Sequence, residues 1–332
     1  MNKRCRFFLN PLPSGKVQSV KIYRILIIKP SAFGDVVQML QAVEGLCHAA
    51  DGKGISLDIH WIIRDCFAEF LRLSPVVSKF FIFERHGGIR GFLRLMREIH
   101  AYNYDYLIDG QGLLRTGLMT FFAKATEKIG RGNAREGSRF FYKKTFMPTF
   151  APFHEVDILQ SLLTPLGLNS QPQRPLTLKG QNWHFPFEKG AILLFPNSGR
   201  FEKEWPFFPE LTRLLLKQTP YRCVWIGQRV PKDVPNHPRF TNFIGQTYLS
   251  DLPTLIRSAR CAVANDSGPV HLAAALKKPL VGIYGPTNGQ RSGPYPTAEH
   301  CILQAQDGNL KNIFPEAVAE AVLRQIEQSR QV

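Results

Sequence analysis

The sequence predicts an α/β protein of two domains that face each other across a cleft. The chain has 332 residues, which exceeds one typical core and fits two domains of ordinary size. The same strand–turn–helix pattern occurs twice, around a turn at 30–35 and around a turn at 265–268. Because ligands of open α/β sheets bind beyond the carboxyl ends of the strands, we expect both turns to face the cleft.

The first domain is predicted to open with a buried strand at 24–29, whose four central residues are all apolar. A helix should follow from 36 to about 50. The remaining elements expected before residue 170 are strands at 56–62, 79–83 and 104–109 and helices at 66–73, 89–101, 113–125 and 154–166. This alternation of strands and helices is typical of a mostly parallel sheet with helices on both faces.

The second domain shows the same alternation. We expect strands at 191–195, 221–226, 261–264 and 280–284 and helices at 207–218, 252–259, after 268 and at 316–328. In the turn before the third helix, Ser267 suits an N-cap, Gly268 allows a ligand close to the backbone, and Pro269 suits the first helical position. Such a helix start attracts a phosphate or diphosphate. An ordinary strand-to-helix connection explains the segment equally well.

These elements divide the chain into four parts. We predict a basic N-terminal arm at 1–22, a Rossmann-like domain at 23–172, a second Rossmann-like domain at 173–310 and a C-terminal segment at 311–332. The boundary between the domains lies in the Pro-rich polar run 171–175. The helix in the C-terminal segment could pack back on the first domain.

The charge of the chain favours an anionic partner. The formal net charge is +16, and residues 1–150 contribute 23 basic and 12 acidic residues, hence +11. Such a field attracts nucleic acid, an acidic membrane surface or a phosphorylated substrate, although simple solubility charge is an alternative. No nucleic-acid-binding signature is present, so we do not expect nucleic acid as a partner. No apolar stretch is long enough for a membrane span or a signal peptide, which predicts a cytoplasmic protein.

The six cysteines show no CxxC spacing, and none is spaced from a histidine as zinc ligands are. Several lie in apolar runs, where a free cysteine acts as a small hydrophobe. We therefore expect neither disulfides nor a bound metal.

Five motifs, in this order, give the chain a family resemblance. They are 29–35 (KPSAFGD), 104–115 (YDYLIDGQGLLR), 197–206 (NSGRFEKEWP), 265–271 (NDSGPVH) and 284–287 (YGPT). Together they resemble the bacterial lipopolysaccharide heptosyltransferases of glycosyltransferase family 9. The segments 66–69, 134–136 and 141–144 fit the subgroup called heptosyltransferase I, which adds the first heptose to the Kdo–lipid A inner core.

The resemblance implies a GT-B fold, that is, two Rossmann-like domains facing across a cleft. It also implies inverting, metal-independent transfer of a heptose from ADP-heptose to Kdo–lipid A during lipopolysaccharide biosynthesis, with no cofactor. Such an enzyme would be a peripheral protein at the inner face of the cytoplasmic membrane. Its partners would be the nucleotide-sugar donor and the anionic glycolipid acceptor.

Two residues match the catalytic positions of the family. Inverting transfer needs a base for the acceptor's proton and a cation for the departing diphosphate. Asp35 matches the proposed base, although a carboxylate is a weak base unless its surroundings raise its pKa. Lys203 matches the lysine that contacts the donor phosphates. The alternatives are an Asp35 that only caps its own helix and a Lys203 that is a solvated surface lysine.

Nine further positions match or border the donor site: Ser198, Gly199, Arg200, Gln228, Asp266, Ser267, Gly268, His271 and Thr287. The chain departs from its relatives at Gly199, where many carry a second hydroxyl residue, and at Gln228, where some carry a ribose-binding glutamate. His271 could donate to a phosphate, or it could be a satisfied core histidine.

Seven cations are candidates for binding the acceptor: Arg64, Arg115, Arg131, Arg135, Arg139, Lys143 and Lys144. Arginine suits the carboxylates of Kdo and the phosphates of lipid A because its guanidinium binds both in bidentate fashion. A solvated basic face is the alternative for each of them.

Two other functions remain open. One is a glycosyltransferase of the same fold with another nucleotide sugar or another surface glycan as acceptor, which donor profiling would distinguish. The other is a non-catalytic module that binds anionic membrane or nucleic acid. The presence of both Asp35 and Lys203 argues against the second, because binding alone does not require the pair.

Overall fold

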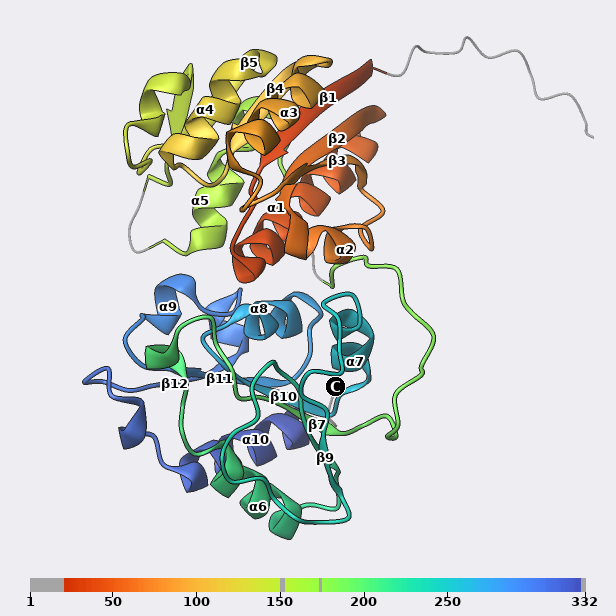
Figure 1. The fold of residues 1–332 in the computed structure, drawn as a ribbon, viewed down its shortest axis with the longest axis vertical. Coiled ribbons are helices and arrows are strands. Elements are labelled where there is room, and N and C mark those ends of the chain that lie inside the picture. The colour runs from red at the N-terminus through yellow and green to blue at the C-terminus, as the bar shows by residue number, and fades with distance from the viewer. Residues whose placement is uncertain (1–20, 150–152, 173–174, 330–332) are drawn as a thin grey trace, which may run out of the picture.

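The computed structural model describes residues 21–149, 153–172 and 175–329 as two α/β lobes stacked on one another (Figure 1). Each lobe contains a six-stranded parallel sheet, with strand order β3-β2-β1-β4-β5-β6 in the first and β12-β11-β10-β7-β8-β9 in the second. This confirms the predicted two-domain α/β class. In both sheets the strand order reverses beside a central strand, and a crevice at the carboxyl ends results.

The first lobe holds the elements up to residue 166. Its strands are β1 (Lys21–Ile28), β2 (Ile55–Arg64), β3 (Val77–Phe83), β4 (Asn103–Asp109), β5 (Lys124–Arg131) and β6 (Lys144–Phe146). Its helices are α1 (Phe33–Asp51), η1 (Asp65–Phe67), α2 (Ala68–Leu71), α3 (Gly88–His100), α4 (Leu114–Phe122), η2 (Ser138–Phe141), α5 (Glu155–Ser161) and η3 (Thr164–Leu166).

The central strand β1 is buried on both faces, as its apolar run predicts. Alternate residues point to opposite faces of a sheet. Ile25 and Ile27 pack with α1 and α5, whereas Leu26 and Ile28 pack with α3 and α4. The helices therefore form one layer on each side of the first sheet.

The sequence prediction fails where strands are polar and where a proline intervenes. The predicted helix 113–125 ends at Phe122, and β5 follows it with charged residues at half of its positions. The predicted helix 154–166 breaks into α5 and η3, because Pro165 lacks an N–H and disfavours a helical residue before it. The predicted helix 66–73 is the short turn η1 followed by one turn of α2.

The second lobe holds the later elements. Its strands are β7 (Ile192–Phe195), β8 (Cys223–Trp225), β9 (Phe240–Asn242), β10 (Cys261–Asn265), β11 (Leu280–Tyr284) and β12 (Cys301–Gln304). Its helices are η4 (Phe201–Lys203), α6 (Phe208–Gln218), α7 (Leu252–Ser258), α8 (Gly268–Ala275), α9 (Gly289–Ser292), η5 (Thr297–Glu299), η6 (Leu310–Asn312) and α10 (Pro315–Gln328). The short edge strand β9 carries no apolar run and was not predicted.

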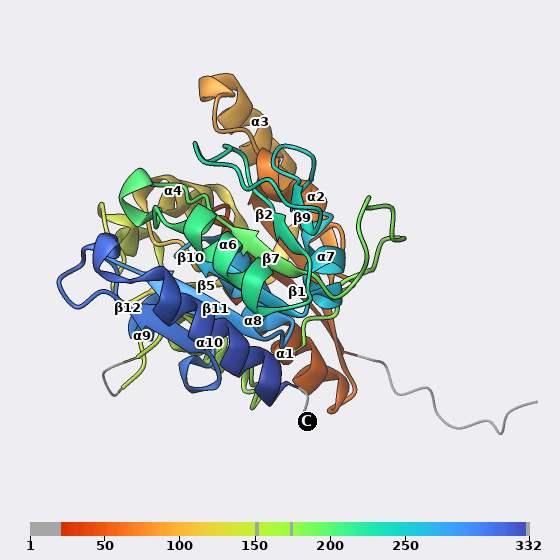
Figure 2. The same cartoon turned by 90° about the horizontal axis from the view of Figure 1, so that it is seen from below.

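The last helix, α10, packs beside α6 on the second sheet (Figure 2). Our prediction that it could pack back on the first lobe is therefore wrong. Val318, Val322 and Ile326 recur along one side of α10 and are buried in the core that also contains the β10 residue Val263. The apolar residues of α10 are buried within the second lobe, so packing on the first lobe would bury no further apolar surface of this face.

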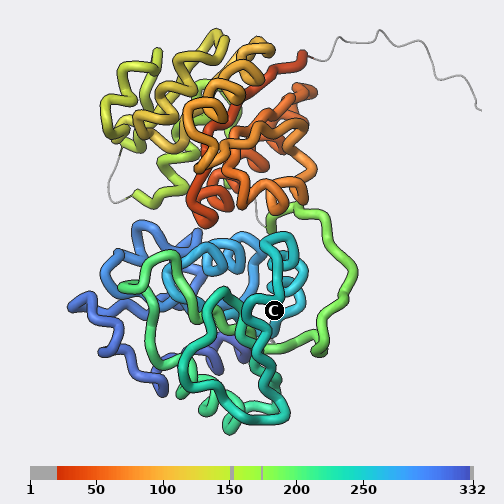
Figure 3. The backbone as a smooth tube through the Cα atoms, viewed as in Figure 1, coloured from red at the N-terminus to blue at the C-terminus, as the bar shows by residue number. Residues whose placement is uncertain are grey.

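The connection between the lobes runs along one side of the molecule as an extended segment (Figure 3). Leu176 N donates to Ala275 O in the second lobe at 2.9 Å, and Thr177 N donates to the buried Glu44 carboxylate in α1 at 3.0 Å. The boundary at 172/173 remains a prediction, because residues 173 and 174 lie outside the described ranges. Of the predicted arm 1–22, only Lys21 and Ile22 are described, and both belong to β1.

The described helices include none that is both long and apolar enough to cross a bilayer.

Candidate active site

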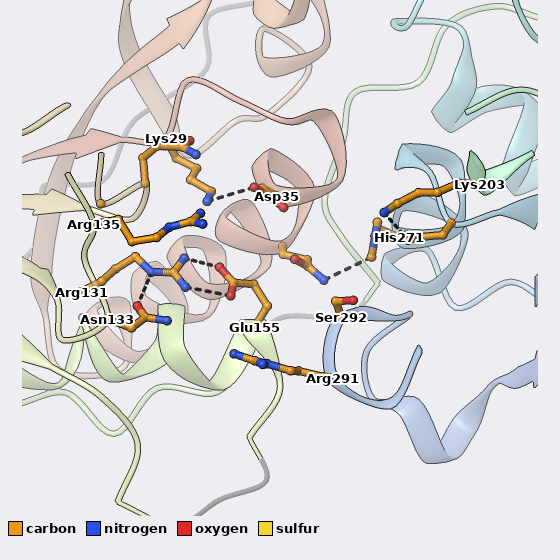
Figure 4. Close-up of a pocket in the computed structure, with 14 residues that line it drawn as sticks. Lys29, Asp35, Arg131, Asn133, Arg135, Glu155, Lys203, His271, Arg291 and Ser292 are labelled. Atoms are coloured by element: carbon orange, nitrogen blue, oxygen red, sulfur yellow. Dashed lines mark hydrogen bonds and ion pairs between the residues drawn. The ribbon is translucent and has the colours of Figure 1, made fainter. Parts of the chain in front are cut away.

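A cavity of about 560 Å³ lies between the two lobes (Figure 4). It opens at the carboxyl ends of the strands in both sheets, where parallel α/β folds place their ligands. The first lobe lines it with Lys29, Asp35, Gln38, Gln111, Gly112, Arg131, Asn133, Arg135 and Glu155, and the second with Lys203, Asp266, His271, Arg291 and Ser292. Both predicted catalytic residues are therefore in the same cavity, from opposite lobes.

Asp35 stands in the first turn of α1 and is held from two sides. Its Oδ2 lies 3.1 Å from Lys29 Nζ and accepts from Ala32 N at 3.3 Å. Burial opposes the charge of Asp35, but Lys29, His271 and the Ala32 amide outweigh it, so its pKa lies below the ordinary value. Asp35 thus caps its own helix and also presents a carboxylate, 39% exposed, to the cavity. Its surroundings do not raise its pKa.

Lys29 follows the last residue of β1, and its side chain is only 1% exposed. Its ammonium donates to Gly110 O at 3.0 Å, at the end of the neighbouring strand β4. A buried lysine is tolerated because Gly110 O and the Asp35 carboxylate both bind its ammonium. Its role was not predicted, although a lysine ending an apolar strand was a visible signal.

The second lobe centres on Asp266, which follows β10. Asp266 Oδ2 lies 2.5 Å from Lys203 Nζ and also accepts from Thr287 Oγ1. Ser198 Oγ donates to Asp266 O at 3.1 Å, which ties the loop after β7 to the same turn. The predicted catalytic Lys203 and the predicted donor-site residue Thr287 therefore meet at the Asp266 carboxylate, and Ser198 binds the main chain of the same residue. An anion that binds Lys203 has to compete with Asp266 for it.

The start of α8 faces the first lobe. Ser267 is the N-cap by position, but its hydroxyl donates to Asn265 O, and Pro269 is the second helical residue, where we had expected the first. A Cβ built on Gly268 would lie 2.2 Å from the ring of Phe33 in α1. Only glycine permits this approach of the two helix starts.

His271 of the second lobe contacts α1 of the first lobe. Its Nδ1 lies 3.2 Å from Gln38 Nε2 in α1, and its ring would lie 2.4 Å from a Cβ on Gly34. Burial lowers the pKa of His271 although Asp266 and Asp35 act in the opposite direction.

Of the nine predicted donor-site residues only Asp266 and His271 line the cavity, and the seven that do not are Ser198, Gly199, Arg200, Gln228, Ser267, Gly268 and Thr287. Gly199 has open space beside its Cα, and the Arg200 side chain is 71% exposed with Glu202 at 3.8 Å. Gln228 is exposed, and its backbone N–H is held by Asn197 Oδ1 at 2.8 Å. The adjacent Arg229, which we did not predict, binds Ser198 O and Glu204.

Of the seven predicted acceptor cations, only Arg131 and Arg135 line the cavity. Arg64 ends β2 beside Asp65, with its N–H bonded to Pro30 O of the first turn. Arg115 lies over the ring of Phe83, 5.2 Å from its centroid. Lys143 Nζ donates to Thr126 O, well back along β5.

Three arginines line the cavity, and they differ in whether they are paired. The Arg131 guanidinium makes a two-pronged pair with Glu155, with one contact of 2.9 Å. Arg291 enters from α9 of the second lobe, and within the described ranges neither it nor Arg135 has an ion-pair partner. These two arginines are available for an anionic substrate. Arg291 is brought in only by lobe packing, so no local pattern could have identified it.

Within the described residues, no group of three or more His, Cys, Asp or Glu side chains is arranged to hold a metal ion.

The chain is similar in sequence and in structure to several glycosyltransferases. A sequence model described as glycosyltransferase family 9 (heptosyltransferase) matches residues 92–319. Lipopolysaccharide heptosyltransferase 1 of Escherichia coli K12 is 27% identical, covering 90% of this chain and 98% of the relative. Lipopolysaccharide heptosyltransferase 2 of the same strain is 32% identical, covering 82% and 85%.

The solved structure of the E. coli heptosyltransferase WaaC with ADP superposes with a TM-score of 0.74 at 22% identity, covering 91% of this chain and 99% of that one. A family 9 glycosyltransferase of Veillonella parvula gives 0.77 at 20% identity, covering 94% and 99%. These likenesses support the GT-B arrangement of the two lobes.

Proposed function

This chain belongs to glycosyltransferase family 9 (heptosyltransferase), and we propose that it transfers a heptose from ADP-heptose to the Kdo–lipid A inner core of lipopolysaccharide. The chain is a glycosyltransferase, and several relatives are named lipopolysaccharide heptosyltransferases. The E. coli WaaC structures contain ADP and ADP-2-deoxy-2-fluoro heptose.

The observation that carries the proposal is the single cavity that Asp35 and Lys203 share from opposite lobes. A carboxylate on one side and an ammonium on the other match the two charges that develop during inverting transfer. The acceptor hydroxyl would lie on the side of Asp35, and the donor diphosphate on the side of Lys203.

In the proposed step the acceptor oxygen attacks C1 of the heptose on the face opposite the diphosphate. The new C1–O bond forms as the C1–O bond to the β-phosphate breaks, and the electron pair stays on the phosphate oxygen. Asp35 accepts the proton of the acceptor hydroxyl. Its lowered pKa keeps it ionised at neutral pH and ready for this role, although it makes it a weak base.

Lys203 and the start of α8 would stabilise the leaving diphosphate. The ammonium moves from Asp266 toward the phosphate oxygens as negative charge grows there. The N-terminus of α8 adds the positive end of the helix dipole. In this proposal the protein's own cations replace a metal ion, and addition of a chelator should leave the rate unchanged.

The acceptor would enter on the side of Arg135 and Arg291, which suit the carboxylates of Kdo because a guanidinium binds a carboxylate in bidentate fashion. A lipid-linked acceptor requires the enzyme to work at a membrane surface. We therefore propose a peripheral enzyme at the inner face of the cytoplasmic membrane.

The test is ADP release from ADP-heptose, with and without Kdo–lipid A, by wild type, Asp35→Ala and the control Asp65→Ala. Asp65 lies in the same lobe but does not line the cavity. We expect acceptor-dependent release that Asp35→Ala abolishes and Asp65→Ala retains. A folded wild type without release would refute heptose transfer, and profiling of other nucleotide sugars would then identify the donor.

A further inference from the structure

One side of the first lobe exposes apolar side chains on three neighbouring elements, α3, α4 and η2. Phe140 is 92% exposed, Ile89 is 70% exposed and Phe121 is 60% exposed, values far above those of core residues. The exposed apolar residues of these elements are Ile89, Leu93, Leu114, Phe121, Phe122 and Phe140. We call this surface the apolar face.

The apolar face is one surface and not a scatter of single residues. Ile89 and Leu93 are one turn apart on α3, and Leu114 and Phe121 are two turns apart on α4, so each pair shares one side of its helix. Other residues of both helices, Leu95, Met96 and Ile99 in α3 and Met119 in α4, are buried in the same core cluster against the first sheet. A Cβ on Gly117 would lie 2.5 Å from Phe141, which shows how closely α4 packs on η2.

Cations accompany the apolar residues. Exposed Arg90, Arg94 and Arg97 run along α3, and exposed Lys124 and Arg139 flank α4 and η2. Arg94 pairs with Glu84 at 2.5 Å, whereas Arg90 and Arg97 have no ion pair among the described residues. Exposed aromatic and aliphatic side chains beside unpaired arginines suit a surface that is apolar inside and negatively charged outside.

The apolar face is continuous with the active-site cavity through two chain segments. Gly112 lines the cavity, and α4 begins two residues later with Leu114. Arg135 lines the cavity, and η2, which carries Phe140, begins three residues later. A molecule docked on the apolar face therefore lies beside the acceptor side of the cavity.

We propose that the apolar face docks on an anionic lipid bilayer, with Phe140 and Ile89 entering the interfacial region and Arg90 and Arg97 contacting lipid phosphates. This rests on the proposed function, because a lipid-linked acceptor explains why the cavity should open beside a bilayer. The positive charge of the first half of the chain strengthens the attraction at a distance.

Binding to lipid vesicles without acceptor tests the surface directly. We expect wild type to bind vesicles that contain phosphatidylglycerol, to bind phosphatidylcholine vesicles far more weakly, and to lose affinity as salt rises. Arg90→Gln and Arg97→Gln should each weaken binding roughly fivefold. The matched controls Lys217→Gln and Lys311→Gln, exposed on the second lobe, should leave it unchanged.

Depth of insertion provides a second readout. In Phe140→Trp and Ile89→Trp, tryptophan emission should shift to the blue on adding phosphatidylglycerol vesicles and be quenched by brominated lipid. Phe314→Trp and Tyr248→Trp, at exposed sites on the second lobe, should show neither effect. Equal responses from both sets would overturn the proposal.

Three outcomes show how this proposal and the proposed function stand or fail separately. If Phe140→Ser loses vesicle binding but transfers heptose normally to a detergent-dispersed acceptor, both stand. If wild type binds vesicles through these residues but transfers no heptose, only the proposed function fails. If wild type is a dimer that Phe140→Ser dissociates, with vesicle binding unchanged, the apolar face binds a second copy and the proposal is wrong.

Discussion

Replacing Gly34 by alanine should weaken the contact between α1 of the first lobe and α8 of the second while leaving each lobe folded. We call the arrangement in which these helices touch the closed arrangement. Gly34 is the second residue of α1 and lies directly against His271 of α8. A Cβ at this position would lie 2.4 Å from His271 Cδ2, about 1 Å short of the 3.4 Å at which ordinary contact begins. The clash crosses the boundary between the lobes.

His271 has little freedom to yield. It is only 9% exposed, and its Nδ1 is tied to Gln38 at 3.2 Å. Overpacking of this kind costs about 1–3 kcal/mol. Alanine in place of glycine also stabilises a helix by up to ~1 kcal/mol, but α1 gains this in open and closed arrangements alike. The clash therefore shifts the equilibrium between open and closed arrangements, whereas the helix propensity changes the free energy of unfolding.

The expected result is a fall of roughly 5–150-fold in kcat/KM for acceptor-dependent ADP release, if catalysis needs the closed arrangement. The midpoint of thermal unfolding should change little, and small-angle scattering should show a larger radius of gyration. Gly180→Ala is the matched control, because a Cβ there meets no atom within 4 Å and Gly180 does not line the cavity.

An unchanged kcat/KM for Gly34→Ala, with unchanged scattering, would refute the reasoning, because it would mean that the contact between α1 and α8 is not part of the active arrangement. A large loss of thermal stability would refute it in another way, since the clash would then act within the folded core of one lobe.

Three further results are expected. Lys29→Met removes the ion pair that lowers the pKa of Asp35, so the acid limb of the pH–kcat/KM profile should move to higher pH; an unmoved limb would mean that Asp35 is not the titrating group. Lys203→Met should lower kcat by roughly 10²–10³-fold, the usual loss on removing one group that stabilises the leaving charge, and a change in donor KM alone would contradict this role. Burial lowers the pKa of His154 and His271, so the folded protein binds fewer protons than the unfolded chain below about pH 6.5. The contribution of these groups to the free energy of unfolding is therefore fully present above that pH and falls as the pH drops. The difference between the midpoints of thermal unfolding at pH 7 and pH 5 should be smaller for His154→Asn than for wild type, and an equal difference would exclude His154 as a contributor.

Some of the predicted site residues are positioned by their neighbours in the sequence, and others by contacts with other elements of the fold. Asp35 and Asp266 each follow a central strand within a few residues, so the strand–turn–helix pattern alone predicted that both face the cleft. Arg64, Arg115 and Lys143 lie outside the cavity lining because strand register and neighbouring rings direct their side chains elsewhere.

Other features depended on partners far away in the sequence. The contact of Gln38 with His271 spans 233 residues, and Arg291 reaches the cavity from α9 of the second lobe. The polar strands β5 and β9 form because a neighbouring strand supplies the hydrogen bonds, which a periodicity in their own residues does not reveal.

Local patterns in the chain were enough to predict the α/β class, the central strands and the positions of Asp35 and Lys203 in their turns, since apolar runs and turn residues act over a few neighbours. The pairing of Asp266 with Lys203, the effect of Lys29 on the pKa of Asp35 and the place of α10 in the second lobe became visible in the folded molecule alone. These outcomes depend on which surfaces meet after folding, and burial and charge then act between residues that the chain alone does not bring together.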